Sequence, residues 1–125
     1  MKTNIKTLLA GVSFMLISTV AAAQFKMSSD GRTLSNSSNS TVGKIDSDGR
    51  TISNASNSTV GKVDSDGKTI SNANGSTVLK ISGNDINNTS GSTIAKMSDV
   101  LNAISGAKPE AKYVALWWFI VKGNR

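Results

Sequence analysis

The side chains of this chain that could do chemistry are carboxylates and hydroxyls, because it contains no His and no Cys. Its only glutamate is Glu110, and two close pairs of aspartates stand at Asp46/Asp48 and Asp64/Asp66. Serines are abundant, but no histidine is present to activate one as a nucleophile. The aspartate pairs fall in turn-forming sequence, without an apolar pocket that would raise a carboxyl pKa. We therefore predict a protein that is not an enzyme and has no catalytic residues.

The same aspartates could also be considered as metal ligands. The text D-S-D-G at residues 46–49 and 64–67 is similar to the start of a calcium loop of the D-x-[DN]-x-[DN]-G type. A third liganding side chain and the acidic residue that ends such a loop are missing. We predict no metal-binding residues and no cofactor, and interpret the aspartates as turn formers. Weak calcium binding by the four aspartates is the alternative.

These aspartates recur because the chain is built from repeats. Similar text runs through residues 30–47, 48–65 and 66–83, and a shorter fourth copy covers 84–99. One such repeat cannot bury its own apolar side chains, so the repeats must pack together. The triplet Phe25-Lys26-Met27 matches Gly43-Lys44-Ile45 and its equivalents, which makes five occurrences of this motif.

Each repeat predicts two short β-strands joined by tight turns. Asp-Gly is a strong turn pair, and polar–aliphatic–polar runs such as Thr51-Ile52-Ser53 alternate as a strand with one buried face does. Val60 and Val63 are spaced so that strict alternation sends them to opposite faces, and a bulge at Gly61 would reconcile them. One aliphatic per half-repeat is expected to point inward: Leu34, Val42, Ile52, Val60, Ile70, Val78, Ile86 and Ile94.

The repeat pattern ends after Asp99, and a closing segment follows at 100–121. Residues 100–104 are expected to supply a partner strand for the last repeat, and Pro109–Ala111 suits a single helical turn. Tyr113–Val121 is an uninterrupted apolar run that holds both tryptophans. It is too short to span a bilayer, and we interpret it as a buried strand that closes the domain. An exposed interaction patch is the alternative.

Residues 1–23 form a predicted signal peptide. Lys2 and Lys6 precede an apolar stretch at 8–20, and Ala21–Ala23 supplies small residues for cleavage. We therefore expect residues 24–125 to be a single β-hairpin repeat domain, exported to the periplasm or the cell exterior. No membrane span is expected in this mature chain, and the absence of Cys excludes a disulfide scaffold.

Positive side chains recur at equivalent positions. The set Lys26, Lys44, Lys62, Lys80 and Lys96 would form a belt that could bind an anion or an acidic glycan. The interpretation that we prefer is that these lysines keep an outer strand soluble and pair with Asp46 or Asp64. Arg32, Arg50 and Lys68 form a second set with the same preferred interpretation. Acidic and basic residues balance across the repeats and no basic stripe carries aromatics, so nucleic acid is not an expected partner.

Regular threonines raise the possibility of an ice-binding surface, which needs a flat face. Twisted hairpins would instead use them as strand formers, and we prefer this interpretation. The Asn-x-Ser/Thr triplets follow from the turn-rich composition. The threonines recur at Thr33, Thr41, Thr51, Thr59, Thr69, Thr77 and Thr93.

Repeats of D-S-D-G-[RK]-T-[IV]-S-N-A-S-N-S-T-[IV]-G-K-[IV], together with the aromatic tail, resemble the secreted bacterial proteins called five-fold β-flowers. The resemblance implies an all-β closed ring of five β-hairpins with pseudo-five-fold symmetry, and implies no activity or functional residue. Leu79 and Ala95 depart from the repeat, as does the shortened turn at Ser82–Asp85. An open β-solenoid is the alternative, but a shortened coil would disturb its stacking, whereas a hairpin tip absorbs the deletion.

These observations together predict an exported non-catalytic β-repeat scaffold or binding module, whose ligand is an unknown protein or glycan. The alternative is a surface-acting ice- or ion-binding protein.

Overall fold

The computed structural model describes residues 24–125, so the predicted signal peptide at 1–23 lies outside the described residues. The described chain forms one ten-stranded sheet and two helical segments. The strands are β2 (Phe25–Met27), β3 (Thr33–Ser35), β4 (Thr41–Ile45), β5 (Thr51–Asn54), β6 (Thr59–Val63), β7 (Thr69–Asn72), β8 (Thr77–Ser82), β9 (Asp85–Asn87), β10 (Thr93–Lys96) and β11 (Ile104–Ser105). The helices are α3 (Met97–Ala103) and α4 (Ala111–Leu116), and α4 continues as the π-helix η1 (Trp117–Val121).

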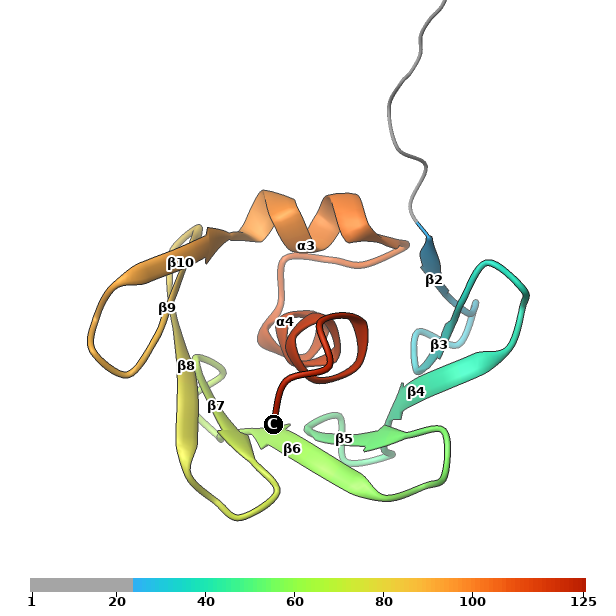
Figure 1. Cartoon of the computed structure of the whole chain (residues 1–125), viewed down its shortest axis with the longest axis horizontal. Coiled ribbons are helices and arrows are strands. Elements are labelled where there is room, and N and C mark those ends of the chain that lie inside the picture. The colour runs from blue at the N-terminus through green and yellow to red at the C-terminus, as the bar shows by residue number, and fades with distance from the viewer. Residues whose placement is uncertain (1–23) are drawn as a thin grey trace, which may run out of the picture.

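Consecutive strands from β2 to β10 pair antiparallel with their neighbours in sequence, as the repeat pattern predicts. We call a strand pair within one repeat a petal, which gives β3–β4, β5–β6, β7–β8 and β9–β10. A further petal joins the two ends of the domain, because β11 pairs in parallel with β2. There Ile104 lies opposite Phe25, as Ile52 lies opposite Gly61 in a regular petal. The strands curve around α4, which is seen end-on in Figure 1.

Each regular petal contains a β-bulge, which changes the face of the sheet to which its aliphatic residues point. Ile52 lies opposite Gly61 but Ser53 lies opposite Thr59, so Val60 is the extra residue. This shift lets Val60 and Val63 both become buried, with 9% and 4% of their surfaces exposed. The predicted bulge is therefore confirmed, one residue before the expected position.

The expected ring closure is not confirmed, because the sheet is open. Within residues 24–125, its two edges are β10 and β11, and α3 lies between β10 and the β2–β11 pair (Figure 1). The antiparallel pairing of consecutive strands also differs from the stacked coils of the alternative β-solenoid. The molecule thus consists of an open β-sheet that curves around α4, and α3 lies in the gap between the two edges of the sheet.

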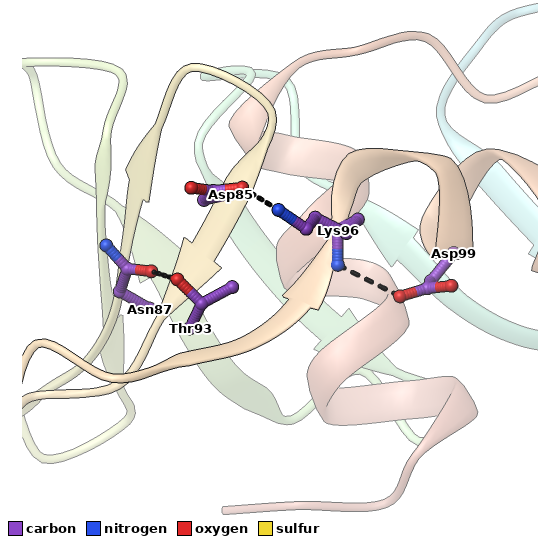
Figure 2. A network of polar contacts seen from close by, with 5 residues as sticks. All are labelled: Asp85, Asn87, Thr93, Lys96 and Asp99. Carbon is purple, nitrogen blue, oxygen red and sulfur yellow. Dashed lines mark hydrogen bonds and ion pairs between the residues drawn. The ribbon is translucent and has the colours of Figure 1, made fainter.

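The prediction of a strand at 100–104 is wrong for most of this segment. Residues up to Ala103 belong to α3, and only Ile104 continues into β11. The helix begins where the Asp99 carboxylate accepts a hydrogen bond from the Lys96 backbone N–H at 2.9 Å (Figure 2). A carboxylate in the first turn satisfies a free donor and favours the helix dipole.

The prediction of a buried strand at Tyr113–Val121 is also wrong in secondary structure, although the segment is buried. It forms α4 and η1, and Pro109 precedes the helix instead of starting a separate turn. A helix that is apolar on all sides is stable when it is surrounded, and here α4 contacts β4, β5, β6 and β7. The core therefore consists of aliphatic residues from the sheet and an apolar central helix. Of the aliphatic residues expected to point inward, Ile94 is instead 42% exposed, and Val42 and Val78 are half-buried.

The residue at the strand position that faces this helix differs between petals, and its size fits the space that the helix leaves there. A Cβ added to Gly43 would lie 2.8 Å from Ile120 Cγ1, and one added to Gly61 would overlap the ring of Phe119. At the equivalent position of another petal the buried Leu79 fills the space itself. Glycine therefore stands where the helix presents large side chains. In residues 24–125, no helix is long and apolar enough to cross a membrane.

Candidate functional site

The five repeated lysines lie on one face of the curved sheet. In β6, Gly61 and Val63 are buried on either side of the exposed Lys62, so the lysine side chain points outward from the core. The same alternation holds in β4, where Lys44 is half-buried between Gly43 and Ile45. We call the set formed by Lys26, Lys44, Lys62, Lys80 and Lys96 the lysine belt.

The register places hydroxyl and amide side chains beside four of the five belt lysines. Lys44 lies opposite Thr33 on one side and Ser53 on the other, and Lys62 lies between Thr51 and Ser71. Directly opposite residues share a face of the sheet. The remaining pairs are Lys26 with Ser35 and Ser105, and Lys80 with Thr69 and Asn87.

The fifth belt lysine is different, because it lies opposite a carboxylate. Lys96 Nζ is 2.5 Å from Asp85 Oδ1, next to the hydrogen bond between Thr93 and Asn87 (Figure 2). In the part of the chain that the structure describes, the only other ion pair joins Lys112 and Glu110 at 3.5 Å. The expected pairing of belt lysines with Asp46 or Asp64 is thus not formed there.

The carboxylate of the second aspartate in each D-S-D-G turn accepts hydrogen bonds from residues that closely follow it. Asp48 accepts hydrogen bonds from the Thr51 hydroxyl at 2.6 Å and from the backbone N–H groups of Thr51 and Arg50, both at 2.8 Å. These bonds lower the pKa of Asp48 to about 2, with the Thr51 hydroxyl as the largest cause. The backbone N–H of Lys68 and the Thr69 hydroxyl likewise lower the pKa of Asp66 to about 2.

The first aspartate of each turn has a different partner. Asp46 accepts a hydrogen bond from the buried Ser53 hydroxyl at 3.0 Å, and Asp64 accepts one from Ser71 at 3.3 Å. The two carboxylates of each D-S-D-G turn therefore bind different partners, one within the turn and the other a buried serine of the following strand. Among residues 24–125, no three carboxylates come together in a way that could hold a metal ion.

The arginine set also has a structural task. Arg50 Nε donates a hydrogen bond to the Val63 carbonyl oxygen at 2.9 Å, and Arg32 Nε donates one to the Ile45 carbonyl oxygen at 3.2 Å. Each bond fastens the open end of a petal, alongside the backbone bond from Val63 N–H to the Arg50 carbonyl. Lys68 occupies the equivalent position in the third petal, where its backbone makes the same bond to Ile81.

Six of the seven regular threonines divide into two groups, and the seventh, Thr33, is half-buried in β3. Thr51 and Thr69 are half-buried and donate to the turn aspartates. The other group is exposed and is distributed over separate petals that curve around α4 (Figure 1). This group does not form the flat face that an ice-binding surface needs. It consists of Thr41, Thr59, Thr77 and Thr93.

The aromatic tail lies mainly in the core. Tyr113, Trp117 and Phe119 are exposed over 4%, 7% and 2% of their surfaces. This burial agrees with the structural interpretation of the segment and leaves little of it for an interaction patch.

Sequence reasoning did not predict two hollows in the surface of the domain. One is lined by the Asp-Gly turns and the residues before α4, and another is lined by Val42, Val60, Phe119 and Ile120. The signal that could have identified the first is the shortened turn at Ser82–Asp85, which departs from the repeat.

Comparisons with known proteins agree with the repeat architecture. Nothing matched the chain among curated proteins or among solved structures. A family model described as "5-fold beta-flower protein" matches residues 18–118, which is most of the chain. The resemblance seen in the repeat text is thereby confirmed, and the chain belongs to the 5-fold β-flower proteins.

Proposed function

We propose that the protein is an exported, non-catalytic binding module that binds acidic glycans through the lysine belt. The observation that supports this proposal is the register of the belt. Lys26, Lys44, Lys62 and Lys80 have hydroxyl or amide neighbours across the strands, whereas only Lys96 faces a carboxylate.

The regular repetition of the belt lysines suits a polymer. Two strand positions separate consecutive belt lysines, and neighbouring strands lie about 4.8 Å apart, so the lysine backbones recur at about 10 Å. The lysine side chains point outward from a curved sheet, so their ammonium groups lie farther apart than the backbones. A flexible acidic polysaccharide that wraps around the sheet could contact several of these ammonium groups in turn, while the half-buried Thr33 and Ser35 and the exposed Ser105 offer hydroxyls to its sugars.

A non-catalytic role is supported by the state of the carboxylates. Asp48 and Asp66 have lowered pKa values and accept several hydrogen bonds in their turns. A general acid at neutral pH needs a raised pKa instead. Export is supported by the apolar stretch and the Ala21–Ala23 triplet of the predicted signal peptide.

The proposal is tested by titrating the protein with heparin, chondroitin sulfate and neutral dextran in isothermal calorimetry. We expect heparin and chondroitin sulfate to bind with an affinity that falls steeply with salt, and dextran not to bind. The triple variant Lys44→Gln, Lys62→Gln, Lys80→Gln should bind at least tenfold more weakly.

A matched control separates the belt from net charge. The triple variant Lys108→Gln, Lys122→Gln, Arg125→Gln removes the same charge from the tail and should bind within about twofold of the original protein. Equal losses in both triple variants, or no binding to either acidic polymer at low salt, would refute the belt as a glycan site.

A further inference from the structure

A hollow of about 440 Å³ lies where the Asp-Gly turns surround the start of α4. It is lined by the turn glycines Gly49, Gly67 and Gly83 and by residues just before and at the start of the helix. Its volume lies in the range of small-ligand pockets. None of the belt lysines belongs to its lining in the described chain, so it is a separate feature from the lysine belt.

The floor of the hollow is apolar and more open than repeat symmetry would make it. Ile45, Val63 and Ile81 occupy equivalent positions near the ends of the strands of three petals. Ile45 and Val63 are exposed over only 1% and 4% of their surfaces, whereas Ile81 is half-buried. Ile81 lines the hollow together with the buried Met97.

Two sequence departures coincide at this opening. The turn after Ile81 is shortened, so that Ser82 pairs directly with Asp85 around Gly83. The residue that would fasten this petal is Lys68, whereas Arg32 and Arg50 bind the carbonyls of Ile45 and Val63. A shorter turn and a missing guanidinium both leave the aliphatic side chain less covered. The apolar floor of the hollow is formed by Val63, Ile81 and Met97, and Ile81 of the irregular petal is the most exposed of the three.

The mouth of the hollow carries both signs of charge. Arg50 and Lys112 supply positive groups, and Asp64 and Glu110 supply negative ones. Lys112 and Glu110 form an ion pair at 3.5 Å with 32% and 49% of their side chains exposed, so both retain access to solvent. Arg50 donates from Nε to the Val63 carbonyl oxygen, and its two terminal nitrogens carry further N–H donors. A ligand that matches this mouth needs one cation and one anion around an aliphatic group.

We propose that the hollow binds a short peptide of two or three residues with free ends and an aliphatic side chain. The aliphatic side chain packs on Ile81 and Met97. The peptide carboxylate pairs with Lys112 and the peptide ammonium pairs with Glu110, so that the two ends replace the solvent-accessible Lys112–Glu110 ion pair. Charge-assisted hydrogen bonds at both ends give this site its preference for free peptides.

The test is a titration of the methyl-labelled protein with the tripeptide Ala-Leu-Ala, followed by nuclear magnetic resonance. We expect saturable shifts of the Ile81 and Met97 methyl signals. Acetylated and amidated Ala-Leu-Ala should bind at least tenfold more weakly because it lacks both charges, and Ala-Ser-Ala should bind at least tenfold more weakly because it lacks the aliphatic group. Absence of saturable shifts, or equal binding of the free and blocked peptides, would overturn the proposal.

Two variants localise the binding. Replacing residues 82–85 with the sequence of residues 46–51 restores the full turn, should cover Ile81, and should abolish the shifts. The variant Glu110→Gln, Lys112→Gln keeps a polar side chain at both positions while removing their charges, and should weaken free Ala-Leu-Ala at least fivefold while leaving the fold intact by circular dichroism. Undiminished binding in the second variant, or in a folded first variant, would place the peptide elsewhere and refute the site.

Discussion

Gly61 lies directly against the ring of Phe119, because a Cβ added at this glycine would overlap the ring carbons Cε2 and Cζ. The backbone carbonyl oxygen of Ser71 closes the other side, 2.7 Å from where a Cβ on Gly61 would stand. The sheet and the helix therefore meet at a position where no side chain fits.

Gly61→Ala is expected to destabilise the protein by about 1–3 kcal/mol, since an extra methyl group in a packed core forces backbone or ring movement. Urea denaturation followed by tryptophan fluorescence measures this loss. Gly43→Ala should cost less, because the three atoms nearest to its added Cβ all belong to the half-buried Ile120 side chain, with Cγ1 closest at 2.8 Å, and none is a backbone atom. If the two variants were equally stable, the close packing of Phe119 on Gly61 would be wrong.

Phe119→Ala should destabilise the protein by about 3–5 kcal/mol, because it removes a large side chain that is only 2% exposed. This is a large part of the stability of an ordinary domain, and thermal denaturation should show it as a strongly lowered midpoint. Ile94→Ala removes an apolar side chain that is 42% exposed and serves as the control. It should change stability by about 0.5 kcal/mol or less, and a comparable loss there would contradict the assignment of the core.

Acid should destabilise the protein through Asp48 and Asp66. Their pKa values are about 2 in the folded state against a usual value of 3.8, so the unfolded chain binds more protons between these values. Stability from the two carboxylates is therefore present above about pH 4 and lost as the pH falls toward 2. Urea midpoints measured from pH 5 to pH 2 should fall less steeply in Asp48→Asn, Asp66→Asn than in the original protein.

The control for this pH dependence is Ser65→Ala, which changes a D-S-D-G turn without touching either carboxylate. It should keep the original slope. Identical slopes in the double asparagine variant would show that these turns do not bind protons differently in the two states.

Lys68→Arg should stabilise the protein by about 0.5–1.5 kcal/mol, because arginine could donate from Nε to the Ile81 carbonyl as Arg50 does to Val63 at 2.9 Å. The reverse change, Arg32→Lys, removes the bond to Ile45 and should cost a similar amount. Chemical denaturation of both variants measures the pair. A loss of stability in Lys68→Arg would mean that the shortened turn has moved the Ile81 carbonyl out of reach.

Most of the sheet could be predicted from the sequence, because the same strand and turn pattern recurs in each repeat. Asp-Gly turns, alternating strands and the spacing of Val60 and Val63 each specify local geometry, and the structure contains the corresponding hairpins and bulges. Outward lysines follow from the same alternation. The hydrogen bonds of Asp48 and Arg50 could not be read in the same way, since they depend on how a petal closes in space.

The segment after Asp99 could not be predicted correctly, because it occurs once and its pattern is ambiguous. Nine apolar residues at Tyr113–Val121 suit a buried strand or a helix surrounded on all sides, and periodicity does not separate these. The segment forms a helix because the space inside the curved sheet accommodates one, and the absence of side chains at Gly43 and Gly61 enlarges this space. The hollow beside Ile81 was missed for a related reason, since it arises from an omission in one repeat.

The parallel pairing of β11 with β2 has a consequence for how the protein is made. Phe25 is among the first described residues to leave the ribosome, yet its partner Ile104 follows only near the end of synthesis. Closing so long a loop is slow and entropically costly. The early petals can form in order of emergence, but β2 keeps an unpaired edge until β11 has been synthesised, and an unpaired edge strand is a site where another chain can add.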